Sequence, residues 1–123
     1  MKSSLQLFVG TVIIGDPTDP PVLKATSDFA DDHIIYGKDP NFGGTINFYI
    51  GIKNIIIDST DIDVDNSITL LDWTVSQATQ LTNVGFNMPN YSTGHVGLTT
   101  QYDYNSNLIL VYYALPLTQS ARD

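Results

Sequence analysis

The 123-residue sequence is long enough for one domain with a substantial core, and it contains no cysteine, which excludes disulfides and thiolate metal sites. Five basic residues stand against thirteen acidic ones, for a net charge of -8, so the chain lacks the positive charge that nucleic acid or an anionic membrane surface requires. No apolar run approaches the length of a membrane span. We expect a single domain over residues 1–123 that binds no nucleic acid and inserts into no membrane.

The composition favours β-strands over helices. The chain contains 13 Ile, 8 Val and 13 Thr, which suit a pleated, half-buried surface. All thirteen acidic residues are Asp, and the absence of Glu removes the usual capping boxes and Glu–Lys pairs of surface helices. The sequence therefore predicts an all-β protein.

The predicted strands are separated by turn-forming stretches rich in Gly, Pro, Asn and Asp. In chain order they cover residues 5–14, 33–36, 45–57, 68–75, 82–88, 95–102 and 107–115. The clearest is 45–57, in which Ile46, Phe48, Ile50 and Ile52 alternate with Asn47, Tyr49, Gly51 and Lys53 on the opposite face.

No two of these strands are joined by the dozen helical residues that a parallel crossover usually needs. The seven or eight short strands predict an antiparallel β-sandwich with Greek-key or jelly-roll-like topology. The proline-rich stretch after the first strand is interpreted as a long internal loop.

An acidic segment follows the strand at 45–57. Asp61, Asp63 and Asp65 recur at every second position, so on a strand they would share one face, and crowded carboxylates of this kind suit Ca²⁺. The same pattern is typical of a solvated strand face whose buried side is formed by Ile62 and Val64. Both interpretations remain open from the sequence.

Two aromatic stretches, residues 36–44 and 86–94, resemble the hairpin signature of βγ-crystallin Greek keys. The segment from Asp65 to Thr69 is similar to that family's calcium motif, although Leu70 replaces the final serine. The resemblance implies two Greek keys and calcium ligation by Asp65, Asn66 and Thr69. Together with the acidic segment, the predicted metal ligands are Asp61, Asp63, Asp65, Asn66 and Thr69, and Ca²⁺ is the one cofactor that the sequence predicts.

The sequence shows no recognisable catalytic motif. His33 and His95 are the only side chains that could act as bases at neutral pH, and neither belongs to a nucleophile elbow, a phosphate-binding loop or a metalloprotease pair. We expect both to be ordinary surface or turn residues. The expectation is a protein that is not an enzyme and has no catalytic residues.

Several tyrosines lie beside polar turns. The residues expected to face a ligand or a neighbouring protein are Asn90, Tyr91, Tyr102 and Tyr104, since rigid amphipathic rings give contact area at low entropic cost. Trp73 and Tyr112 lie in apolar strands and are expected in the core.

These observations favour a structural or assembly protein, such as a virion coat or decoration subunit or a surface-layer component, that contacts itself or another structural protein. A homo-oligomer on a virion or an extracellular surface fits this hypothesis. One alternative is a calcium-binding βγ-crystallin-like module. The other is a small lectin that binds glycans.

Overall fold

The computed structural model describes residues 1–43, 47–75 and 78–100. Its strands are β1 (Leu5–Gln6), β2 (Val12–Ile14), β3 (Val22–Lys24), β4 (His33–Tyr36), β5 (Gly51–Asp58), β6 (Ile68–Trp73), β7 (Gln80–Asn87) and β8 (His95–Thr100). One sheet, called sheet A, has the order β1-β4-β6-β8, and in the other, sheet B, β5 pairs with β2, β3 and β7. Every one of these pairs is parallel.

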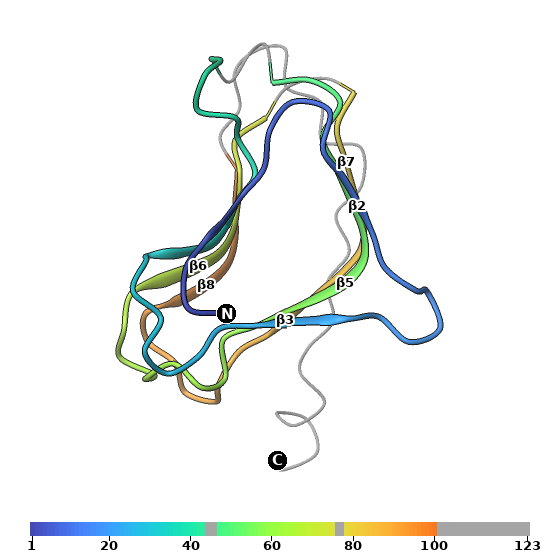
Figure 1. Ribbon diagram of the computed structural model, residues 1–123. Helices are drawn as coiled ribbons and strands as arrows, with labels where there is room; N and C mark the ends of the chain where they lie inside the picture. The colour runs from blue at the N-terminus through green and yellow to red at the C-terminus, as the bar shows by residue number, and fades with distance from the viewer. Residues whose placement is uncertain (44–46, 76–77, 101–123) are drawn as a thin grey trace.

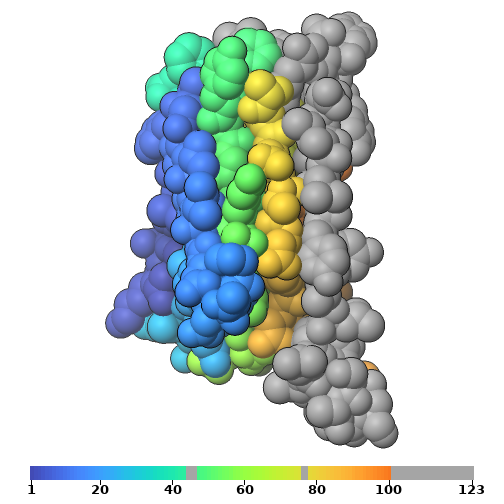
Figure 2. All heavy atoms as spheres, turned by 90° about the vertical axis from the view of Figure 1, so that its right-hand side faces the viewer, coloured from blue at the N-terminus to red at the C-terminus, as the bar shows by residue number. Residues whose placement is uncertain are grey.

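The chain passes from one sheet to the other and back, with β2 and β3 together forming one pass through sheet B, so it winds as a coil. Leu5, Ile35, Leu71 and Leu98 occupy one register position in sheet A, which gives roughly 30 residues to a coil, within the range of solenoid repeats. Figure 1 looks along the coil and shows successive turns superimposed in a three-sided outline. Figure 2 shows sheet B from outside, with the strands of successive turns side by side. The fold is a parallel β-helix.

The all-β prediction is confirmed, but the antiparallel sandwich with Greek-key or jelly-roll-like topology is wrong. The prediction assumed that a parallel connection needs a helix. Here each parallel connection passes through the other sheet, which carries the chain around the coil, and the described residues of these connections contain no helix. In the part of the chain that the structure describes, no helix is long and apolar enough to cross a membrane.

The strand at 33–36 is confirmed residue for residue, and β5 to β8 overlap their predicted strands. The predicted strand 5–14 is instead two short strands, β1 and β2, which belong to different sheets. The predicted long loop after it contains β3. The predicted strand 107–115 lies outside the described residues.

The core consists of aliphatic side chains stacked between successive turns of the coil. Ile13, Ile52 and Leu81 form one register stack in sheet B, and the first of them is partly buried while the other two are fully buried. Each fully buried Ile or Leu stabilises the fold by about 1.5–3 kcal/mol. Because the stack joins three turns of the coil, its packing favours this strand register over registers shifted by one residue.

Asn54 and Asn83 lie at a bend that divides sheet B into two halves and forms a corner of the coil. The first half of β5 pairs with β2 and its second half with β3, and Asn54 lies at the bend with φ 56. Asn83, at φ 52, makes the same bend in β7, and its Nδ2 donates to Asn54 Oδ1 at 3.0 Å. Asn54 Nδ2 in turn donates to the Gly15 carbonyl oxygen at 3.3 Å. Asn tolerates this left-handed conformation better than other residues with a side chain, which explains its place at the corner.

A second polar residue organises the turn after β4. Asn47 is fully buried, and its Oδ1 accepts from the Asp39 N–H at 2.6 Å while its Nδ2 donates to the carbonyl oxygens of Phe42 and Gly43. Asn47, which was predicted on a strand face opposite the isoleucines, instead lies in the turn before β5.

Candidate functional site

A shallow hollow lies on the outward face of sheet B, which Figure 2 presents to the viewer. Val12, Gly51 and Gln80 are adjacent partners on β2, β5 and β7, and Gly51 forms the floor because it has no side chain. The hollow has a volume of about 250 Å³. We call it the outer-face pocket, and its lining residues are Val12, Tyr49, Ile50, Gly51, Lys53, Ala78 and Gln80.

Tyr49 gives the outer-face pocket an aromatic wall. Its side chain is 66% exposed, and its ring centroid lies 6.0 Å from that of Phe48. The backbone at Tyr49 is left-handed, at φ 61, and its N–H donates to the Ala78 carbonyl oxygen at 3.1 Å. A left-handed backbone costs a residue with a side chain about 1–2 kcal/mol relative to the ordinary helical region.

This left-handed position recurs in three turns of the coil. Counting back two residues from the paired positions Val12, Gly51 and Gln80 leads to Gly10, Tyr49 and Ala78, with φ of 88, 61 and 56. The turn into sheet B therefore requires this conformation in each coil, and glycine meets the requirement in the first. The tyrosine is not required by the backbone.

The polar groups of the outer-face pocket are Lys53 and Gln80, both partly buried. Within the described residues, neither the Lys53 ammonium nor the Gln80 side-chain amide has a hydrogen-bond or ion-pair partner. Both are therefore able to bond a ligand without first breaking an internal contact. The sequence placed Tyr49, Gly51 and Lys53 on the face opposite the isoleucines, and the outward positions of Gly51 and Lys53 confirm this.

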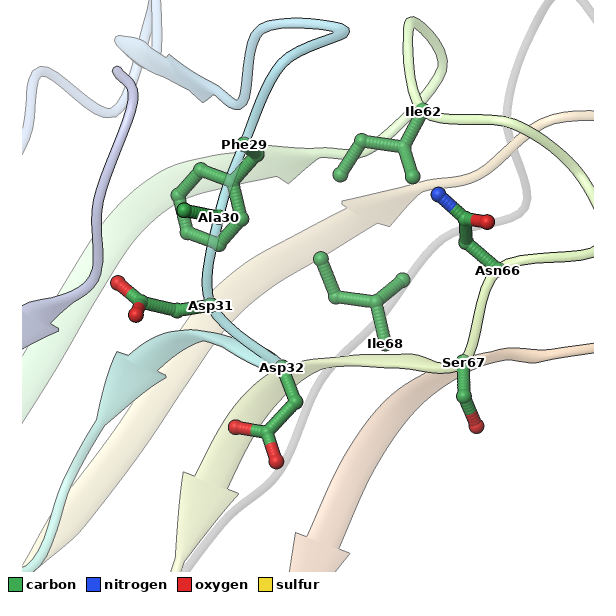
Figure 3. A pocket seen from close by; sticks show the side chains of 8 residues that line it. All are labelled: Phe29, Ala30, Asp31, Asp32, Ile62, Asn66, Ser67 and Ile68. Atoms are coloured by element: carbon green, nitrogen blue, oxygen red, sulfur yellow. The ribbon is translucent and has the colours of Figure 1, made fainter.

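A larger hollow of about 310 Å³ lies between the turns that precede β4 and β6. We call it the turn pocket, and its lining residues are Phe29, Ala30, Asp31, Asp32, Ile62, Asn66, Ser67 and Ile68. Figure 3 shows Phe29, Ile62 and Ile68 around its interior, whereas the carboxylates of Asp31 and Asp32 turn away from it.

The two carboxylates of the turn pocket are already bonded. Asp31 Oδ2 accepts from the Ser4 N–H at 2.7 Å, and Asp32 Oδ1 bonds His33 Nδ1 at 2.8 Å and the Tyr36 hydroxyl at 2.7 Å. The hydrogen bond from His33, followed by the one from Tyr36, lowers the pKa of Asp32. The same carboxylate raises the pKa of Tyr36 to about 12. Asp32 is therefore held ionised as part of a surface cluster.

The His95 ring makes two hydrogen bonds that the sequence did not predict. It lies on β8, where its Nε2 faces the Asp63 carbonyl oxygen at 2.8 Å and its Nδ1 faces Ser59 Oγ at 2.9 Å. A carbonyl oxygen only accepts, so Nε2 carries the proton and Nδ1 accepts from the serine. Ser59 is fully buried, which makes this pair a structural link between a turn and β8 and keeps it out of reach of a substrate.

The predicted metal ligands lie mainly in the turn between β5 and β6, and only Thr69 is on a strand. Asp61 pairs with Lys24 at 3.4 Å, Asp63 Oδ1 accepts from the Asp65 N–H at 2.9 Å, and Asp65 Oδ1 accepts from Thr93 at 3.2 Å. Because the segment is not a strand, its carboxylates do not share a strand face. Across residues 1–43, 47–75 and 78–100, no three His, Cys, Asp or Glu side chains are grouped to hold a metal ion. Calcium ligation by these residues stays a prediction.

The predicted partner residues are only partly described. Tyr91 is 89% exposed in the turn before β8, at φ 58, and the neighbouring Asn90 buries its Oδ1 without a hydrogen-bond partner. Tyr102 and Tyr104 lie outside the described residues. The outer-face pocket contains none of the four residues, so they and the pocket are separate candidates for a binding surface.

Comparison with known proteins identifies the family of this β-helix. Residues 1–113 match the family model described as rhamnogalacturonase A/epimerase, pectate lyase-like. The chain belongs to this pectate lyase-like family. The βγ-crystallin resemblance is therefore wrong: residues 36–43 and 86–94 lie at the ends of parallel strands and in the turns that follow, not in antiparallel hairpins.

Three similar relatives of this pectate lyase-like chain are named as glucan-degrading enzymes. A glucan endo-1,3-beta-glucosidase of Trichoderma harzianum is 39% identical over 66% of the chain, and a glucan 1,3-beta-glucosidase of Cochliobolus carbonum is 33% identical over 72%. A probable glucan endo-1,3-beta-glucosidase of Arthroderma benhamiae is 34% identical over 63%. The matches cover 11%, 12% and 10% of those proteins, so the chain spans about a tenth of their length.

A fourth relative is named differently. It is called a non-secreted LysM effector, from Penicillium expansum, and is 27% identical over 87% of the chain and 9% of its own length.

These findings overturn the functional hypotheses drawn from the sequence. A virion coat or decoration subunit, a surface-layer component, a calcium-binding crystallin-like module and a small lectin are all wrong, because the family and its named relatives are carbohydrate-active. The expectation that the protein is not an enzyme is contradicted by the same family match and by the relatives named as glucosidases. That expectation rested on the absence of a recognisable catalytic motif in the sequence.

Proposed function

We propose that this chain is a β-helical, glucan-recognising part of a glycoside hydrolase that acts on β-1,3-glucan. The observation that carries the proposal is the 33–39% identity to three proteins named as glucan 1,3-beta-glucosidases. The fold supports it, since a parallel β-helix presents a regular outer face on which a polysaccharide can lie. A glycan partner was expected under the lectin hypothesis, and we keep the glycan partner here for a glycoside hydrolase in place of a lectin.

Charge favours a neutral glucan over a pectic substrate, although the family description mentions pectate. A polyuronate carries one carboxylate on each sugar, and a chain with net charge -8 repels it. Hydrogen bonds lower the pKa of Asp16, Asp28 and Asp32, so these surface carboxylates stay ionised under ordinary conditions. A neutral β-glucan meets no such barrier.

Polymeric glucan is encountered outside the cell, and we propose an extracellular site of action. This retains the extracellular part of the localisation expected from the sequence and leaves out the virion, which the family does not support.

The test is cosedimentation of the chain with insoluble β-1,3-glucan, with cellulose and immobilised polygalacturonate as matched surfaces. We expect retention on β-1,3-glucan and little on the other two. Release of reducing ends from the same glucan reports hydrolysis in parallel. Equal retention on all three surfaces, or retention on polygalacturonate alone, would contradict the proposed substrate class.

A further inference from the structure

The outer-face pocket has a residue that the fold does not need. Tyr49 occupies a left-handed position that glycine fills in the preceding coil, and two thirds of its side chain is exposed, so neither the backbone nor the core explains it. Unfavourable backbone conformations of this kind are often found at binding sites, where a side chain is kept for its contact with a ligand. The observation directs attention to what the tyrosine ring faces.

The ring borders a hollow of the size and chemistry of one sugar. The volume of about 250 Å³ is below the usual range of about 300–1,000 Å³ for drug-sized ligands, which suits a single pyranose ring. Val12 and Ala78 supply exposed apolar surface, and Lys53 and Gln80 supply polar groups with no partner in the described chain. A pyranose has the matching pattern, with an apolar C–H face and a rim of hydroxyl groups.

We propose that the outer-face pocket is a subsite for one neutral glucosyl unit of a bound β-glucan. The unit stacks on Tyr49 above the floor at Gly51, and its hydroxyl groups bond Lys53 and Gln80. This inference rests on the proposed function and names where on the β-helix the glucan is held.

The turn pocket is a weaker candidate for this role. Its carboxylates turn away from the hollow and are bonded within the protein, and its interior is formed by Phe29 and two buried isoleucines. Asn66 and Ser67 give it polar side chains, but its aromatic ring, Phe29, is partly buried against the core, whereas Tyr49 is 66% exposed and presents its ring to a sugar.

The main experiment titrates a soluble β-1,3-gluco-oligosaccharide into the chain and into the variants Tyr49→Gly, Tyr91→Gly and Ala78→Gly. All three substitutions place glycine at a left-handed position, so none should lower the unfolding midpoint. We expect Tyr49→Gly to bind at least about fivefold more weakly, because it loses the stacking ring. Tyr91→Gly removes a still more exposed ring, in the turn before β8, and should bind as the unsubstituted chain does. Ala78→Gly lies in the pocket lining and serves as a control for stability alone.

A variant at Gly51 and a measurement that locates the bound sugar test the position of the subsite independently of Tyr49. A Cβ added at Gly51 would lie 3.8 Å from its nearest neighbours, the Gln80 carbonyl oxygen and Val12 Cγ1, so Gly51→Ala should fold and yet raise the pocket floor by a methyl group. We expect it to weaken binding. In backbone-amide NMR spectra, the shifts induced by the oligosaccharide should centre on residues 49–53 and Gln80.

The outcomes separate the two proposals. If the unsubstituted chain binds and Tyr49→Gly binds equally well, the subsite is wrong while the proposed function stands. Loss of binding in Tyr91→Gly alone moves the site to the turn before β8 and overturns the inference. If the chain binds no β-glucan, both proposals fail. Preferential binding of oligogalacturonate would overturn the neutral subsite.

Discussion

The asparagine corner of sheet B gives the most quantitative prediction about the fold. Asn54 makes two side-chain hydrogen bonds, one with Asn83 Nδ2 at 3.0 Å and one with the Gly15 carbonyl oxygen at 3.3 Å, and it holds a left-handed backbone at φ 56. Each hydrogen bond contributes about 0.5–1.5 kcal/mol, so their loss in Asn54→Gly costs about 1–3 kcal/mol. Asn54→Ala adds the left-handed penalty and should cost about 1 kcal/mol more than Asn54→Gly.

The measurement is urea unfolding of both variants, followed by circular dichroism. The control pair is Asn66→Ala and Asn66→Gly, at an exposed turn position without a positive φ. Here the Asn66→Gly variant should be the less stable of the two, because glycine increases the conformational entropy of the unfolded chain. The order of Ala and Gly should therefore reverse between positions 54 and 66. An Asn54→Ala variant at least as stable as Asn54→Gly would refute the role given to the backbone conformation.

The remaining predictions concern a turn, an acid transition and a metal ion. Replacement of Asn47 by alanine should lower stability by about 1–3 kcal/mol, because the buried Asp39 N–H loses its acceptor, and urea unfolding will measure it. Burial opposes ionisation of the Asp39 carboxyl group, but hydrogen bonds from Asn41 and Val9 outweigh it and lower its pKa below the ordinary 3.8. The ionised Asp39 carboxylate, like that of Asp32, therefore stabilises the fold above about pH 3.8, and this stabilisation is lost as the pH falls through the lowered pKa. The midpoint of urea unfolding, measured over a series of pH values, should decline in this range. The decline should be smaller in the Asp39→Asn variant. Calcium ligation in the turn between β5 and β6 predicts a higher melting temperature with Ca²⁺ than with a chelator, and equal temperatures would dismiss it.

The local β-structure of this chain could be predicted from its sequence. β-Branched residues and alternation locate β4 exactly and β5 to β8 approximately, and the same alternation places Gly51 and Lys53 on the outward face. These properties depend on the preferences of single residues and on their nearest neighbours along the chain, which the sequence contains directly.

The pairing of the strands was decided by tertiary structure. Strands separated by turns satisfy their hydrogen bonds equally well by folding back as antiparallel neighbours or by continuing around a coil, and local pattern does not distinguish the two. The choice here depends on stacks such as Ile13, Ile52 and Leu81, whose members lie roughly 30–40 residues apart and become neighbours only when the whole coil closes.

The candidate binding site depends on the same long-range register. By itself the sequence determined an acidic, β-rich chain without cysteine, with tyrosines available for contact, and it directed attention to Asn90, Tyr91 and the acidic turn. Only the tertiary structure brought Val12, Gly51 and Gln80 side by side from three turns of the coil beside the strained Tyr49. The physical reason is that a pocket made by parallel pairing joins residues whose distance in space is unrelated to their distance along the chain.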